Sequence, residues 1–113
     1  MSKELETGKV PVDILNRIVL DPINNNKHKS KDVVIRPSTG EDCSAVDTEG
    51  EICVLSTDPI TASGSNAGYL VVHINCNDAA SAGAEPIGIL LTALLPEHST
   101  EEDLSDIING VYK

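Results

Sequence analysis

The chain has 113 residues, a formal net charge of -10, three cysteines, two tyrosines and neither Trp nor Phe. A chain of this length buries enough surface for one core, which must be aliphatic here, and not for two. The eight basic residues all lie before Pro37, except for the final Lys113. The stretch from Pro37 to Tyr112 therefore contains no Lys or Arg, although it holds thirteen of the 18 acidic residues.

This composition argues against several classes of partner. Nucleic-acid affinity comes mainly from Lys and Arg that neutralise phosphates, and single strands also need aromatic platforms, so we expect no nucleic-acid partner. No apolar run approaches the roughly 20 residues that span a bilayer, and the first six residues lack a signal-peptide segment. Cys43, Cys53 and Cys76 are odd in number and form no C-x-x-C pair, which favours reduced thiols and a cytoplasmic protein without a membrane partner.

The first third of the chain predicts an arm, a helix and a loop. Residues 1–9 have no periodicity and are expected to form a flexible N-terminal arm. Val10 to Leu20 carries apolar residues at helical spacing, with Pro11 suited to a first turn. Asp21-Pro22 is expected to end this helix, and the polar run from Ile23 to Lys31 to form a loop.

The middle of the chain predicts strands. Val33 to Arg36, Cys43 to Thr48 and Ile52 to Thr57 are the three candidates. Thr48-Glu49-Gly50-Glu51 is typical of a hairpin turn in which Gly adopts a positive φ.

The remaining elements alternate between helix and strand. Ser65 to Gly83 is ambiguous by pattern, but its length favours a helix that Gly83 ends. Pro86 to Leu95 is an almost uninterrupted apolar run, as expected for a strand covered on both faces. Ser99 and Glu102 match a capping box, which predicts a final helix through Val111.

Five polar residues stand where solubility alone would not place them. Asp42 precedes a predicted strand, Asp58 follows another, and Asn75, Asn77 and Asp78 interrupt the most apolar helix. Carboxylates and amides are the hard oxygen ligands that Mg²⁺ prefers, with phosphate and water completing its octahedron. Because residues 37–112 contain no Lys or Arg, a nucleotide bound there would need metal ions to bridge its phosphates. Backbone N–H groups of Gly-containing segments and Lys9, beside Gly8 on the arm, could assist.

Each of these residues also has a plainer interpretation. Asp42 and Asp58 could be ordinary turn and strand-end residues. The Asn77-Asp78 pair could form a polar network that fixes helix packing, His73 could be a packed histidine, and Lys9 a surface lysine. No Walker loop, G-x-G-x-x-G, G-x-S-x-G or H-E-x-x-H pattern is present to support another mechanism.

Three motifs together resemble a known superfamily. They are Gly40-Glu41-Asp42-Cys43-Ser44-Ala45-Val46-Asp47, Ser56-Thr57-Asp58-Pro59-Ile60 and Asn77-Asp78 with its following Ala79-Ala80-Ser81-Ala82-Gly83-Ala84-Glu85-Pro86. They are similar to the successive motifs of the aminoimidazole ribonucleotide (AIR) synthase-related superfamily, which includes thiamine-monophosphate kinase and selenophosphate synthetase. Gly8-Lys9-Val10-Pro11 and His73-Ile74-Asn75-Cys76-Asn77-Asp78 most resemble its hydrogenase-maturation-like branch.

The resemblance implies an α+β fold, with a mixed, largely antiparallel sheet of about four strands and helices packed on one face. Residues 10–113 would form the N-terminal domain, which binds ATP and Mg²⁺ and forms a homodimer through sheet pairing. By matching motif, Asp42, Asp58 and Asp78 would be metal ligands. Lys9, Gly40, Asn75 and Asn77 would bind the nucleotide, and no catalytic residue is assigned.

The resemblance also leaves two departures and one alternative. Glu41 stands where many members have a second Asp, and Tyr69 follows Gly68 where an Arg is common. The family's C-terminal domain, which completes the active site in cis or in trans, is absent from these 113 residues. We therefore expect part of an ATP-dependent enzyme that is inactive alone. The alternative is a non-catalytic dimerisation module that retains the fold.

Overall fold

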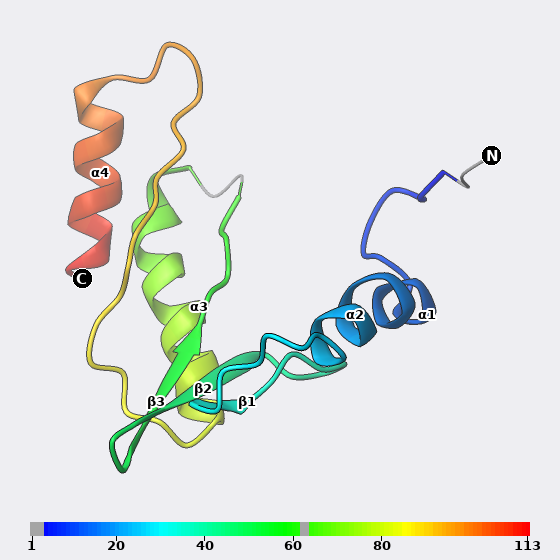
Figure 1. Cartoon of the computed structure of the whole chain (residues 1–113). Coiled ribbons are helices and arrows are strands. Elements are labelled where there is room, and N and C mark those ends of the chain that lie inside the picture. Colours follow the sequence, from blue (N-terminus) through cyan, green and yellow to red (C-terminus); the bar gives the residue numbers. More distant parts are fainter. Residues whose placement is uncertain (1–3, 62–63) are drawn as a thin grey trace. The chain divides into compact units, whose positions relative to one another are not determined.

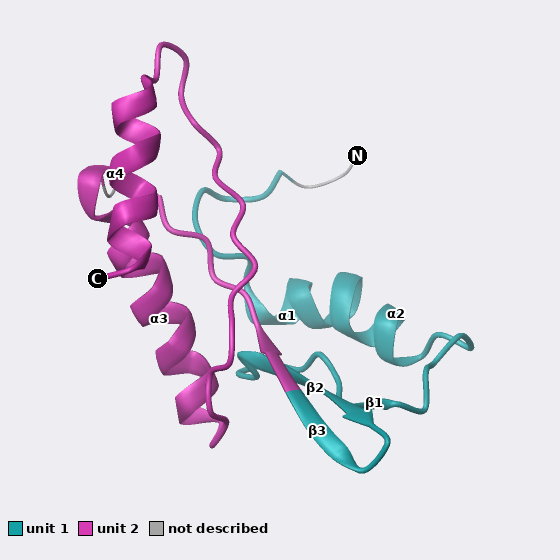
Figure 2. Cartoon of the chain, turned by 90° about the vertical axis from the view of Figure 1, so that its left-hand side faces the viewer, with its two compact units in different colours: residues 1–53 teal, residues 54–113 magenta. Residues whose placement is uncertain are grey.

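The computed structural model of the chain describes residues 4–61 and 64–113 (Figure 1). The first three residues of the predicted arm lie outside these ranges. The chain forms two compact units, Met1–Cys53 and Val54–Lys113, coloured separately in Figure 2. The fold combines helices with an open sheet of three antiparallel strands, which confirms the predicted α+β class with three strands where about four were expected.

Unit 1 begins with a short helical segment in three parts, α1 (Val12–Leu15), the π-helix η1 (Asn16–Leu20) and α2 (Asp21–Asn24). The predicted helix is confirmed, but the prediction that Asp21-Pro22 ends it was wrong. The Asp21 N–H donates to the Asn16 carbonyl, five residues back, so a wider π turn precedes the proline. Pro22 is the second residue of α2, and the helical conformation continues past it to Asn24.

The sheet has the strand order β1-β2-β3, with β1 at Val33–Ile35, β2 at Cys43–Thr48 and β3 at Glu51–Ser56. β1 and β2 are antiparallel, with Val33 opposite Val46 and Ile35 opposite Ala45. The register therefore shifts by one residue between Val33 and Ile35, as in a β-bulge.

A two-residue turn joins β2 to β3. Glu49 has φ 60° and Gly50 φ 103°, and positive φ at both central positions suits the twist of the flanking strands. The Gly50 N–H also donates to Asp47 Oδ1 at 2.9 Å. This confirms the predicted hairpin.

The buried apolar side chains among the described residues all belong to unit 1. Ala45 is 1% exposed, Cys43 7% and Leu20 9%. Cys43 and Ala45 are alternate residues of β2 and therefore share one face of the sheet. The burial of Cys43 agrees with its interpretation as a small core residue.

Unit 2 contains the 3₁₀ turn η2 (Gly64–Asn66), α3 (Ala67–Ser81) and α4 (Glu101–Val111). The helical interpretation of the ambiguous segment is thus confirmed, and Gly83 follows α3 with φ 79°. α3 and α4 lie side by side (Figure 1), and a buried glycine on each helix, Gly68 and Gly110, marks their close approach. A Cβ added at Gly110 would lie 2.9 Å from the Tyr69 backbone nitrogen.

The capping box of α4 was predicted one residue too early. The Thr100 hydroxyl accepts from the Asp103 N–H at 3.2 Å, and the Asp103 carboxylate accepts from the Thr100 N–H at 2.7 Å. Ser99 is engaged elsewhere, because its hydroxyl donates to the Pro96 carbonyl at 2.8 Å.

The predicted strand from Pro86 to Leu95 was wrong. The structure describes this whole segment and gives it no strand. Ile87, Leu90 and Leu94 are each more than 90% exposed, so the segment is not covered on both faces as the prediction assumed. An apolar run indicates a tendency to be buried, but a strand also requires a neighbour that accepts its backbone hydrogen bonds.

Within the part of the chain that the structure describes, no helix is both long enough and apolar enough to cross a membrane.

Candidate functional site

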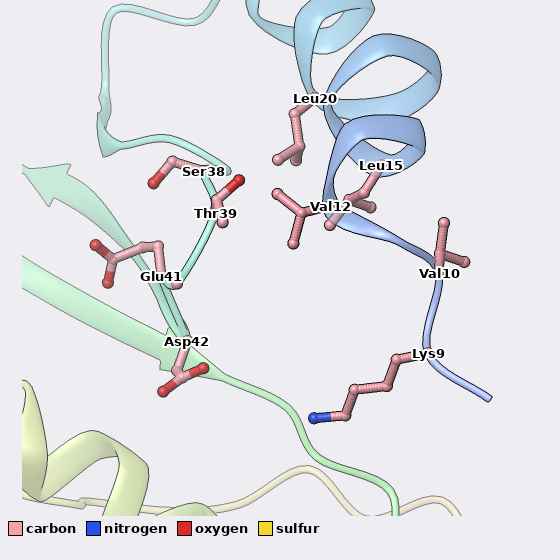
Figure 3. Close-up of a pocket in the computed structure, with 10 residues that line it drawn as sticks. Lys9, Val10, Val12, Leu15, Leu20, Ser38, Thr39, Glu41 and Asp42 are labelled. Atoms are coloured by element: carbon pink, nitrogen blue, oxygen red, sulfur yellow. The ribbon is translucent and has the colours of Figure 1, made fainter.

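A cavity of about 560 Å³ in unit 1 is the candidate site (Figure 3). The arm and the helical segment supply one wall, and the loop before β2 supplies the other. The first wall consists of Lys9, Val10, Val12, Leu15 and Leu20, and the second of Ser38, Thr39, Gly40, Glu41 and Asp42. This volume lies within the range of small-molecule sites, roughly 300 to 1,000 Å³. Most of the lining residues are exposed, so the cavity is an open depression on the surface of unit 1.

The helical wall is apolar. Val12 and Leu15 are three residues apart in α1 and so lie on one side of the helix, and Leu20 ends the π turn. Leu20 is also buried, at 9% exposure. Figure 3 shows these three side chains on the side of the cavity opposite the loop. This wall suits the apolar face of a ligand.

The loop wall is polar and has a defined backbone. The Glu41 N–H donates to the Ser38 carbonyl at 3.2 Å, which closes a tight turn. Gly40 has φ 79°, a conformation that L side chains rarely adopt. Asp42 follows directly and precedes β2, so the sheet anchors the end of the loop. The turn from Ser38 to Glu41 and the following Asp42 thus line one side of the cavity.

Side-chain hydrogen bonds tie this loop to the helical segment. The Thr39 hydroxyl donates to Asn16 Oδ1 at 2.8 Å, and Asn24 Nδ2 donates to the Pro37 carbonyl at 2.8 Å. Both asparagines are half-buried. These contacts join the two walls of the cavity.

Lys9 is the one cationic residue of the cavity lining, which also contains the carboxylates of Glu41 and Asp42. In Figure 3 its side chain extends from the arm with the amine directed toward the side on which Asp42 lies. Three of the seven predicted site residues, Lys9, Gly40 and Asp42, therefore line one cavity. Their roles in binding stay predictions.

The other four predicted site residues belong to unit 2. Asn75 Nδ2 donates to the Asp58 carbonyl at 3.1 Å and to the Val71 carbonyl at 2.8 Å, so it attaches the segment after β3 to α3. Asp78 lies three residues after Asn75 and shares its helix face. Asn77, the residue before Asp78, is exposed. The Asp58 backbone thus contacts the side of α3 on which Asn75 and Asp78 lie.

The three predicted metal ligands are divided between the units, with Asp42 in unit 1 and Asp58 and Asp78 in unit 2. Among residues 4–61 and 64–113 the structure gathers no group of three or more His, Cys, Asp or Glu side chains that could hold a metal ion. The donor set still fits Mg²⁺, which proteins commonly hold through one or two carboxylates together with substrate phosphates. Asp42 is the predicted ligand that lines the cavity.

The sequence did not predict the apolar wall or the hydrogen bonds that connect the helical segment to the loop before β2. The sequence predicts a helix with apolar residues at helical spacing from Val10 to Leu20, but two of these residues, Ile18 and Val19, are 56% and 40% exposed. The π turn shifts the buried position to Leu20. Asn16 is a lone amide within the apolar helix, and this was the one sequence signal for a hydrogen bond from the helix to another segment. Its partner Thr39 lies 23 residues away.

A comparison with protein families identifies the class of this domain. Residues 40–113, more than half of the chain, match the family described as AIR synthase related protein, N-terminal domain. The chain therefore belongs to this family, and the resemblance found in the three motifs is confirmed. Searches of curated proteins and of solved structures found no match. The matched range includes Gly40, Asp42 and all four predicted site residues of unit 2.

Proposed function

We propose that this chain is the ATP- and Mg²⁺-binding N-terminal domain of an ATP-dependent enzyme of the hydrogenase-maturation-like branch of the AIR synthase-related family. The observation that carries the proposal is the cavity of unit 1, in which Lys9, Gly40 and Asp42 line the same space. Family membership over residues 40–113 supports it. The Gly8-Lys9-Val10-Pro11 and His73 to Asp78 motifs support the choice of branch.

The charge distribution supports a metal-dependent mode of phosphate binding. Residues 37–112 contain no Lys or Arg, so a triphosphate that contacts this part of the chain meets mainly carboxylates. Bound Mg²⁺ would supply the positive charge that screens the phosphates from these carboxylates. Asp42, Asp58 and Asp78 would hold the metal.

The chain's other groups would contact the nucleotide itself. The Lys9 amine would approach the phosphates from the arm, and the backbone at Gly40 would accommodate them closely. Asn75 and Asn77 of α3 would also bind the nucleotide. The apolar wall of Val12, Leu15 and Leu20 would pack against the base.

The remainder of the enzyme belongs to this proposal as well. A homodimer formed through sheet pairing and a C-terminal domain, in cis or in trans, would complete the active site. The complete cytoplasmic enzyme would use ATP to phosphorylate or activate an oxygen of its substrate.

A second function, that of a non-catalytic dimerisation module, is favoured by the exposed apolar segment of unit 2. Ile87 is 96% exposed, Leu90 104% and Leu94 91%, and large exposed apolar patches commonly mark protein interfaces. This module would form the dimer without binding a metal or a nucleotide. Metal-dependent nucleotide binding therefore separates the two functions.

Isothermal titration with Mg-ATP tests the proposal. The titration uses the chain alone and the chain with a family C-terminal domain added in trans. Asp42→Asn, Asp58→Asn and Asp78→Asn should each weaken binding by about tenfold or more, because a charge-assisted contact is lost. Asp106→Asn on the exposed surface of α4 is the matched control and should bind like the wild type. No binding in either format, or equal affinity in all four variants, would reject the proposal.

A further inference from the structure

The loop that carries Gly40 and Asp42 is held by residues that the family motifs do not include. The Thr39 hydroxyl donates to Asn16 Oδ1 at 2.8 Å, across 23 residues of sequence. Asn24 Nδ2 donates to the Pro37 carbonyl at 2.8 Å, across 13 residues. Asn16 and Asn24 lie before residue 40, where the family match begins.

Asn16 occupies a special place in the helical segment. It is the first residue of the π-helix, and its carbonyl accepts the Asp21 N–H. Its predecessor Leu15 lines the apolar wall of the cavity, as does Leu20 at the end of the same π turn. Its side chain bonds Thr39 in the opposite wall. The amide thus spans the two walls.

We propose that Asn16 is a positioning residue for the nucleotide site, acting through Thr39. The hydrogen bond holds the turn of Ser38 to Glu41 against the helix and so fixes where Gly40 and Asp42 meet the phosphates and the metal. Gly40 has φ 79° and no Cβ, so its own side chain does not restrict the backbone, and the Thr39 hydrogen bond adds a restraint from the helical segment. This inference rests on the proposed function of the cavity.

We expect loss of the hydrogen bond between Thr39 and Asn16 to lower the affinity for the nucleotide more than the free energy of unfolding. The bond is exposed, so water replaces it when it is broken and the folded state loses little. A loop released from the helix samples additional conformations, and the apparent affinity falls in proportion to the fraction that remains competent to bind. A structural hydrogen bond without this role would leave the affinity unchanged.

Two variants remove the hydrogen bond between Thr39 and Asn16, one at the acceptor and one at the donor, and two others are matched controls. Asn16→Ala removes the acceptor, and Thr39→Val removes the donor while keeping the side-chain shape. Thr39→Ser keeps the hydroxyl and should restore the bond. Asn25→Ala removes an exposed amide at the end of α2.

The first measurement needs no ligand. Hydrogen exchange of the Glu41 amide, which donates to Ser38, reports whether the turn stays closed. Asn16→Ala and Thr39→Val should speed this exchange, whereas Thr39→Ser and Asn25→Ala should leave it at the wild-type rate. Thermal unfolding of all four variants should stay close to the wild type.

The second measurement is the dissociation constant for Mg-ATP, in the same format as the wild-type titration. Asn16→Ala and Thr39→Val should raise it about 3- to 10-fold, the usual effect of one hydrogen bond. Thr39→Ser and Asn25→Ala should not change it. Wild-type exchange and affinity in all variants would overturn this inference alone. Absence of Mg-ATP binding by the wild type would overturn the proposed function instead, and the positioning role with it.

Discussion

The contact between α3 and α4 gives the sharpest stability prediction, at Gly68→Ala. A Cβ at Gly68 would overlap the Ile107 carbonyl oxygen and lie 2.8 Å from the Ile107 carbonyl carbon and 3.0 Å from the Val111 nitrogen. All three are backbone atoms of α4, so no side chain can rotate away. The two helices would have to separate.

The magnitude follows from two opposing effects. Replacing a helical Gly by Ala favours the helix by about 1 kcal/mol. Overpacking costs about 1 to 3 kcal/mol, and a backbone overlap belongs at the upper end of that range or beyond it. We therefore expect Gly68→Ala to lower the free energy of unfolding by about 2 kcal/mol or more, as measured by urea denaturation followed through the helical circular dichroism signal.

Two other glycines calibrate this result. Gly110→Ala brings its Cβ to 2.9 Å from the Tyr69 nitrogen and 3.2 Å from the Gly68 α-carbon, so its cost should be smaller. Gly88→Ala meets nothing within 4 Å and should change stability by less than about 0.5 kcal/mol. A Gly68→Ala variant as stable as the wild type would refute the helix packing described for unit 2.

Three further changes test the local structure of unit 2. Thr100→Ala removes the N-cap of α4 and should cost about 1 kcal/mol of unfolding free energy in urea denaturation, whereas no cost would contradict the capping box. The Thr100 backbone N–H, and then its hydroxyl, lower the pKa of the Asp103 carboxyl below its ordinary value. The stabilisation that Asp103 gives is therefore complete above that ordinary value of about 4 and is lost as the pH falls through the lowered pKa. Asp103→Asn should remove this part of the acid dependence of α4 helicity, and an unchanged acid profile would contradict the assignment. Asn75→Ala breaks the bond to the Asp58 carbonyl and should cost about 1 kcal/mol in denaturation and speed hydrogen exchange after β3, while wild-type values would contradict that contact.

Local patterns in the sequence predicted most of the secondary structure. The candidate strand from Cys43 to Thr48, followed by a Glu-Gly turn, has the same bounds as β2 in the structure. Length alone favoured a helix over a strand for α3, and the structure agrees. These features depend on neighbours in sequence, which is why they could be read from it.

The predicted ends of helices were wrong where two local patterns competed or where the structure of a neighbouring turn determines the end. Ser99 and Thr100 each precede an acid by three residues, and the hydrogen bond from Ser99 to Pro96 leaves Thr100 as the cap. A proline after a helical stretch predicts the end of a regular helix. Here a π turn precedes Pro22, and the helical conformation continues through α2.

The candidate site was predictable only in part. The motif residues Lys9, Gly40 and Asp42 were identified from the sequence and line one cavity. The bond between Asn16 and Thr39 depends on tertiary structure, because no pattern relates a helical amide to a hydroxyl 23 residues later.

The proposed function predicts that this domain holds phosphates through Mg²⁺, because residues 37–112 contain no Lys or Arg. The most direct test is to titrate ATP into the protein with the C-terminal domain present, once in Mg²⁺ and once in EDTA. We predict clear binding in Mg²⁺ and its loss in EDTA, with only a partial loss for Lys9→Ala in Mg²⁺. Equal affinity with and without the metal, or no binding in either condition, would contradict the claim.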